Sequence, residues 1–107
     1  MKYDDYSLRQ IRVAEEFYVK LKRYCHSHCT KMFSLYDEVL NWFLEQYANN
    51  PLIYYHASFK NGRCLSLWVH KSKIEKIQQM AKTAQVSDAR IIATALMLYF
   101  KERNISL

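Results

Sequence analysis

The chain has 107 residues, half of them apolar, which is enough for one small domain with a core and argues against wholesale disorder. A single Gly and a single Pro argue against glycine-rich phosphate loops and dinucleotide fingerprints, and they favour helices joined by short connections. The net charge of +6 points to a polyanionic partner. The excess lies in residues 51–107, which hold nine Lys or Arg against three Asp or Glu.

The sequence carries no sign of a membrane or an export pathway. No run of about 18 uninterrupted apolar residues is present, so we expect no membrane span. The first residues are polar and acidic, unlike a signal peptide. Cys25, Cys29 and Cys64 make an odd number of cysteines, and we interpret them as reduced thiols. We therefore expect a cytoplasmic protein that does not interact with a membrane.

The first half of the chain predicts a short strand followed by two helices. Residues 7–13 end in an alternating pattern that predicts a strand with Ile11 and Val13 on one face. From Glu15 the apolar spacing becomes helical. Ser34, with an acidic residue three positions on, is typical of the N-cap of a second helix, which we expect to end at residues 48–51.

The second half predicts the same order of elements after an aromatic-rich connector over residues 49–62. Residues 63–70 alternate strictly and form the clearest predicted strand of the chain. Ser72 and Glu75 make a capping box for a third helix. Ser87 is the expected N-cap of a fourth helix, which ends near residues 103–104.

The order strand, helix, helix therefore occurs twice, over residues 7–48 and 63–104 of one compact domain that spans residues 1–107. A shift of 56 positions superposes the strands and first helices, whereas a shift of 53 superposes the second helices. The difference predicts a three-residue insertion within residues 25–31. Chance similarity between two amphipathic helix pairs is the alternative interpretation.

The second repeat resembles the ribbon-helix-helix family, the fold of the methionine and Arc repressors. The resemblance rests on the alternating strand at 65–69, the helix start at 71–75 and the segment 86–92, and residues 8–48 fit it more loosely. It implies a mainly α fold with a short two-stranded antiparallel ribbon, in which two units of one chain form a pseudodimer. Tandem proteins of this kind occur among accessory factors of conjugative DNA transfer, such as TraY-type proteins.

Strand parity assigns the two faces of such a ribbon. Pairing of residues 8–13 with 64–69 turns five apolar side chains inward, namely Ile11, Val13, Leu65, Leu67 and Val69. The outer face, which enters the DNA major groove in this family, then carries Gln10, Arg12, Ser66 and Trp68. Gln suits adenine and Arg suits guanine, whereas Trp68 either presses on a thymine methyl group or sugar or is covered by the chain. The alternative for Arg12 is a solvated strand charge.

The resemblance also implies phosphate contacts at the starts of the second helices. This role falls to Ser87 and, more loosely, to Ser34, because a helix N-terminus offers free N–H groups and a positive dipole end. Arg90, Lys82 and Lys71 are candidate phosphate neighbours in the basic half. Simple capping by the serines and ordinary surface positions for the cations are the alternatives.

Metal binding and catalysis find little support in the sequence. Cys25, His28 and Cys29 share one helical face, but no second ligand pair stands at zinc-site spacing, so we expect no metal and no cofactor. A helix end with small buried thiols is the simpler interpretation. No nucleophile in a preorganised turn and no paired carboxylates stand out, so we do not expect an enzyme.

The expected function is sequence-specific binding of double-stranded DNA, as a transcriptional regulator or as an accessory factor of plasmid or conjugative DNA processing. Self-association on DNA stays open. The alternative is a small helical protein-interaction module, adaptor or antitoxin-like, because aromatic residues make up 15% of the chain and the Tyr- and Phe-rich connector could form a partner surface. Packing of the core explains much of that content, and the few residues after the last predicted helix argue against a toxin-binding tail.

Overall fold

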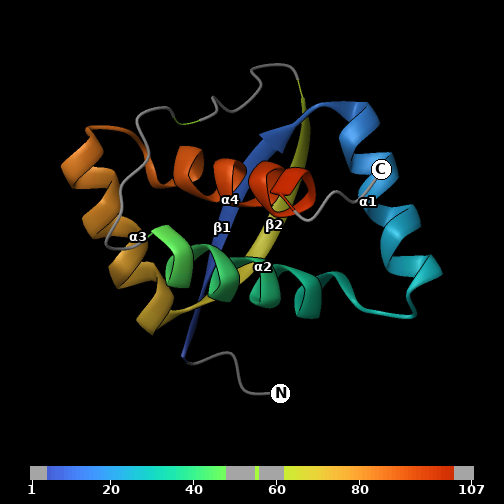
Figure 1. The fold of residues 1–107 in the computed structure, drawn as a ribbon, viewed down its shortest axis with the longest axis horizontal. Helices are drawn as coiled ribbons and strands as arrows, with labels where there is room; N and C mark the ends of the chain where they lie inside the picture. Colours follow the sequence, from blue (N-terminus) through green and yellow to red (C-terminus); the bar gives the residue numbers. More distant parts are fainter. Residues whose placement is uncertain (1–4, 48–54, 56–61, 103–107) are drawn as a thin grey trace.

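The chain folds as two successive strand-helix-helix units in the computed structural model, which describes residues 5–47, 55 and 62–102 (Figure 1). The elements are β1 (Tyr6–Val13), α1 (Glu15–Ser27), α2 (Met32–Tyr47), β2 (Arg63–His70), α3 (Lys71–Ala84) and α4 (Asp88–Glu102). This mainly helical architecture is the predicted one. Of the expected connector, only Tyr55 and Gly62 are described, and the predicted repeat ends at 48 and 103–104 also lie outside the described residues.

The two strands pair with each other, antiparallel, within one chain. The register places Gln10 opposite Ser66, with Leu8 opposite Trp68 on one side of this pair and Arg12 opposite Cys64 on the other. A lone strand exposes unpaired N–H and C=O groups along its edges, and each strand here supplies partners to the other. The predicted antiparallel ribbon is therefore internal to the chain.

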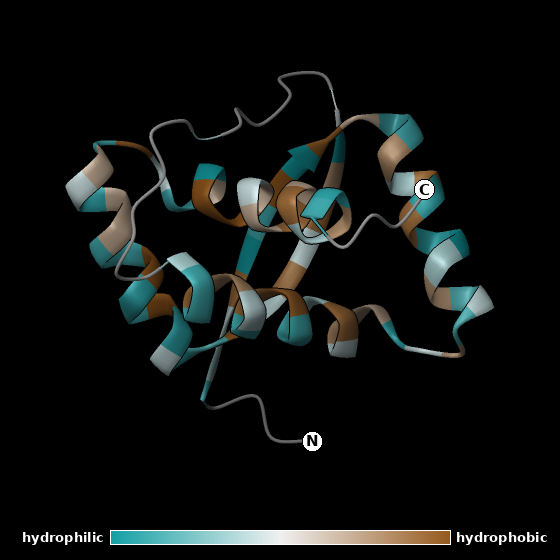
Figure 2. Cartoon of the chain, in the orientation of Figure 1, coloured by the Kyte–Doolittle hydropathy of each residue, from teal (hydrophilic) through white to brown (hydrophobic). Residues whose placement is uncertain are grey.

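The inner face of the ribbon is the one that strand parity predicts. All five expected side chains are buried, and they join one continuous core with the helices: Ile11, Val13, Leu65, Leu67 and Val69. In Figure 2 apolar residues, drawn in brown, recur along the central helices α2 and α4, whereas polar and intermediate residues predominate along α1 and α3. The helices therefore cover the face of the ribbon that the sequence marks as apolar.

Helices α2 and α4 pack side by side under the ribbon, and α1 and α3 lie at opposite ends of this pair (Figure 1). Much of the aromatic content fills the contacts between them. The rings of Phe17 and Tyr24 from α1 meet Phe100 of α4 edge-on, at centroid distances of 6.2 and 5.1 Å. Trp42 of α2 meets Tyr99 of α4 in the same way at 5.6 Å. These pairs bind the two halves together through their side chains.

The two repeats superpose with a single shift, which corrects the predicted insertion within residues 25–31. Glu15 and Lys71, which begin α1 and α3, are 56 positions apart, and so are Met32 and Asp88, which begin α2 and α4. With this one shift the buried residues of α2 coincide with buried residues of α4, as in Phe43 with Tyr99. The separate shift of 53 was wrong because it took Ser34 for a helix N-cap.

The predicted cap at Ser87 is confirmed, whereas those at Ser34 and Ser72 are wrong. The Ser87 hydroxyl accepts from the Arg90 N–H at 3.2 Å. Ser34 lies inside the first turn of α2, because α2 already begins at Met32. Cys29, between α1 and α2, adopts the left-handed conformation (φ 50°), which ends the turn that follows α1. Ser72 lies inside α3, because β2 runs into the helix without a loop and the cap falls to the last strand residue.

That residue is His70, whose Nδ1 accepts from the Ser72 N–H at 3.2 Å. An imidazole nitrogen thus caps α3, as a Ser or Asp side chain caps most helix starts.

None of the helices in the described part of the chain has the length and apolar character needed to cross a bilayer.

A charge on the inner face of the ribbon tests this architecture. Leu67 is 1% exposed, so Leu67→Asp buries an unpaired carboxylate and should lower the free energy of unfolding by about 3–5 kcal/mol. Ser66→Asp, one residue away on the exposed face, is the matched control and should melt like the parent. Thermal unfolding followed by circular dichroism measures both. Equal melting of the two variants would contradict the parity of β2.

Candidate nucleic-acid interface

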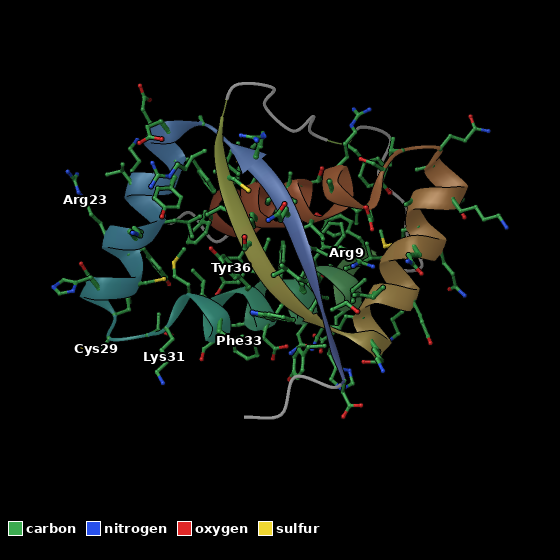
Figure 3. The ribbon with its side chains drawn as sticks, turned by 180° about the vertical axis from the view of Figure 1, so that it is seen from behind. Arg9, Arg23, Cys29, Lys31, Phe33 and Tyr36 are labelled. Atoms are coloured by element: carbon green, nitrogen blue, oxygen red, sulfur yellow. The ribbon has the colours of Figure 1, made fainter. Side chains whose placement is uncertain are left out.

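The outer face of the ribbon is a surface of six exposed side chains, three from each strand. They are Leu8, Gln10 and Arg12 from β1, and Cys64, Ser66 and Trp68 from β2. Seen from behind, the ribbon crosses in front of α2 and α4, with α1 and α3 on either side of it (Figure 3). A twisted two-stranded ribbon of this kind has the width that the DNA major groove admits. We call these six residues the outer ribbon face.

The four residues predicted to face bases are brought together on this face. Gln10 and Ser66 form the central cross-strand pair, and Arg12 and Trp68 lie on opposite sides of it. The prediction left out Leu8 and Cys64, which occupy the same face. Their signal was present in the sequence, because strand parity puts every second residue of a strand on the same face.

The guanidinium of Arg12 is held at one end of the ribbon. Its Nη1 donates to the carbonyl oxygen of Gly62 at 2.9 Å. This bond restrains a long side chain that otherwise loses conformational entropy on binding. Arg12 thus combines exposure, a full positive charge and a partly fixed direction, which are the properties of a side chain that makes bidentate hydrogen bonds to guanine.

The start of α4 is fixed beside β1. Arg9, on the inner face of the ribbon, donates through Nε to Asp88 Oδ2 at 3.2 Å and through Nη1 to the Leu8 carbonyl oxygen at 3.0 Å. Asp88 is the first residue of α4, directly after the cap Ser87. The pair ties the ribbon to the predicted phosphate-binding helix start, and Arg9 offsets the negative charge that Asp88 brings there.

The start of α2 flanks the other end of the ribbon. The ring of Phe33, in the first turn of α2, lies 5.5 Å from the ring of Tyr6, which in turn meets the His70 ring edge-on at 5.2 Å. Lys31 stands at the N-cap position, since its carbonyl accepts from the Leu35 N–H at 3.0 Å. Figure 3 shows Lys31 on the same side of the ribbon as Phe33.

Lys31 is the phosphate candidate that sequence reasoning missed. It is exposed, the first turn of α2 holds no acidic residue, and the single 56-residue shift puts it on Ser87. The predicted candidate Ser34 is exposed three residues further on. A cation with free helix N–H groups behind it suits a phosphate oxygen better than a serine alone. A uniform shift applied to the sequence would have found it.

The remaining phosphate candidates are spread over α3 and α4. Arg90 donates through Nη2 to the carbonyl oxygen of Tyr55 at 2.7 Å, so its partly buried side chain holds that buried connector residue against α4. Lys71 is exposed at the first position of α3, and its N–H donates to the Asp5 carbonyl oxygen at 2.8 Å. Lys82 is exposed in the last turn of α3.

The last turn of α1 and the residues just after it contain Cys25, His28 and Cys29. The Cys25 thiol is buried and donates to the sulfur of Met32 at 3.2 Å, and its burial raises the pKa of Cys25. The His28 ring stacks on Tyr24 with a centroid distance of 4.0 Å. Cys29 is exposed in its left-handed turn. Among the described residues, no group of three His, Cys, Asp or Glu side chains is arranged to hold a metal ion.

Comparison with known proteins finds no match for this chain among family models, curated proteins or solved structures. The outer ribbon face and the two helix starts beside it are therefore the features of this chain that indicate a function.

The three thiols should differ in reactivity. The thiolate is the reactive form, so the buried Cys25, with its raised pKa, should react slowly with Ellman's reagent, whereas the exposed Cys29 and Cys64 react fast. We expect two fast equivalents in the folded protein and three in denaturant. Cys64→Ser should remove one fast equivalent. Three fast equivalents in the folded protein would show that Cys25 is not packed against Met32.

Proposed function

We propose that this protein binds double-stranded DNA sequence-specifically, by inserting the outer ribbon face into the major groove. It acts as a transcriptional regulator or as an accessory factor of plasmid or conjugative DNA processing. The observation that carries the proposal is the grouping of exposed Gln10, Arg12 and Ser66 on one face of a two-stranded ribbon. These are three of the side-chain types that pair with base edges.

The surroundings of the ribbon support the same proposal. Lys31 and Ser87 mark two helix starts that are related by the 56-residue shift. Such paired helix ends suit phosphates on either side of the base-contacting ribbon. The net charge of +6 favours association with a polyanion and steers it at long range.

The βααβαα topology with an internal ribbon is consistent with two ribbon-helix-helix units. It is the arrangement expected of the tandem, TraY-type proteins that the sequence resembles. One chain then supplies a whole ribbon, which most members build from two chains. The free thiols fit a reducing compartment, and the cytoplasm is the proposed place of action.

A protein-interaction module draws less support. The rings of Phe17, Tyr24, Trp42 and Tyr99 pack against one another or against Phe100, so they do not form an aromatic partner surface. Leu8 and Trp68 are exposed, but they lie on the outer ribbon face itself. The polar and charged members of that face are groups that bind base edges.

Salt dependence provides the first test. The full chain should select duplexes from a random pool, and its affinity for a selected duplex should fall steeply between 50 and 200 mM salt, because phosphate contacts release counterions. Fluorescence anisotropy of a labelled duplex measures the slope. A chain that retains no duplex from the pool even at low salt would overturn the proposal.

Arginine substitutions distinguish the loss of a base contact from the loss of one positive charge. Arg12→Ala should cost about 1–3 kcal/mol on the selected duplex and much less on scrambled DNA. Arg23→Ala removes the same charge from α1, where the side chain points away from the ribbon (Figure 3), and is the matched control. Lys31→Ala and Lys82→Ala should weaken all duplexes alike if they contact phosphate. Equal effects of Arg12→Ala and Arg23→Ala would exclude Arg12 as a base contact.

A further inference from the structure

The outer ribbon face has two ends that are related by symmetry but differ in chemistry. With the 56-residue shift, Arg12 corresponds to Trp68, Leu8 to Cys64 and Gln10 to Ser66. Gln10 and Ser66 also pair with each other, so the approximate twofold axis that relates the two units passes between them. In a ribbon built from two identical chains both ends are identical. Here every symmetry-related position carries a different residue.

One end is charged and hydrogen-bonding. Arg12 lies opposite Cys64, and the Gly62 carbonyl oxygen holds its guanidinium at 2.9 Å from Nη1. A guanidinium recognises the O6 and N7 atoms of guanine, which lie side by side on the major-groove edge of that base. The small thiol opposite leaves the guanidinium as the dominant group of this end.

The other end is apolar. Leu8 and Trp68 face each other across the two strands and are 43% and 39% exposed. They are two of the three large apolar side chains that the described surface exposes. The only apolar group that a base pair presents in the major groove is the thymine methyl, which apolar side chains contact. The start of α2 flanks this end, where the ring of Phe33 lies 5.5 Å from the ring of Tyr6.

We propose that the DNA site of this protein is asymmetric, with guanine under Arg12 at one end and thymine under Leu8 and Trp68 at the other. The inference rests on the proposed DNA-binding function. Arg12 and Leu8 are four residues apart on β1, about 13 Å along the strand, so the base-contacting region covers about four base pairs. The chain then binds in one orientation only, whereas a symmetric ribbon binds a palindrome in two equivalent ones.

Selection followed by substitution in the DNA tests the asymmetry. The full chain is used to select duplexes from a random pool, and the enriched motif should lack twofold symmetry. Replacing the thymines of the apolar end by deoxyuridine removes only their methyl groups and should weaken binding about fourfold for each contacted methyl. This loss should disappear in Trp68→Ala or Leu8→Ala. Arg12→Ala should instead relax the preference for guanine at the opposite end and leave the uracil effect unchanged.

A symmetrised variant provides a gain of function. Leu8→Cys combined with Trp68→Arg makes the apolar end a copy of the Arg12–Cys64 end. This double variant should prefer an inverted repeat of the guanine half-site over the site selected by the parent. Both positions are exposed, so thermal melting should stay close to that of the parent, which checks that the fold is intact.

The outcomes separate this inference from the proposed function. Absence of any retained duplex overturns both. A selected palindrome, or a parent chain that is indifferent to deoxyuridine, overturns the asymmetric site and leaves DNA binding in place. Unchanged affinity and preference in Trp68→Ala also overturns it, and leaves the Leu8–Trp68 pair as a surface for a protein partner.

Discussion

The pairing of β1 with β2 is the constraint on which the rest of the structure depends. Two strands make the smallest sheet, and such a ribbon is marginal in water unless one face is packed on other elements. Its register, with Gln10 opposite Ser66, decides which side chains reach the core and which stay outside. A slip of one residue would expose Ile11 and Leu67 and bury Gln10 and Ser66. The register of β1 against β2 therefore determines both which residues enter the core and which form the outer ribbon face.

The joining of two units in one chain has consequences for stability and for recognition. Because the ribbon is completed within the chain, its formation does not depend on protein concentration, as it does in an obligate dimer. The second unit is always present at high effective concentration. The sequences of the two units can also diverge, and residues at equivalent positions of α1 and α3 differ. Where α3 places Ile74 and Met80, α1 places Tyr18 and Tyr24.

The same divergence appears in the electrostatics of the helix starts. The start of α4 carries Asp88, which is offset by Arg9 from the ribbon, whereas the start of α2 carries Lys31 and no acid in its first turn. The Arg9–Asp88 pair is only partly exposed, at 28% and 34% of its side-chain surface, so solvent screens it less than a fully exposed pair. It serves to fix the position of α4 more than to add net stability.

Much of the fold follows from local patterns in the sequence. Strict alternation identified both ribbon faces, and helical spacing identified the helices, because side-chain direction repeats every two residues in a strand and every 3.6 in a helix. The positions of Gln10, Arg12, Ser66 and Trp68 on the outer ribbon face followed from that parity alone. The sequence also indicated the repeat, although the second helices of the two units were aligned three residues out of register.

The tertiary structure decided what no local pattern encodes. The start of α2 at Met32 depends on the left-handed turn at Cys29, and the cap of α3 by His70 depends on a strand that runs directly into a helix. The attachment of Arg90 to Tyr55 and of Arg9 to Asp88 joins residues 35 and 79 positions apart. Side-chain type sets what a residue can bond to, but only the folded chain brings a particular partner within reach.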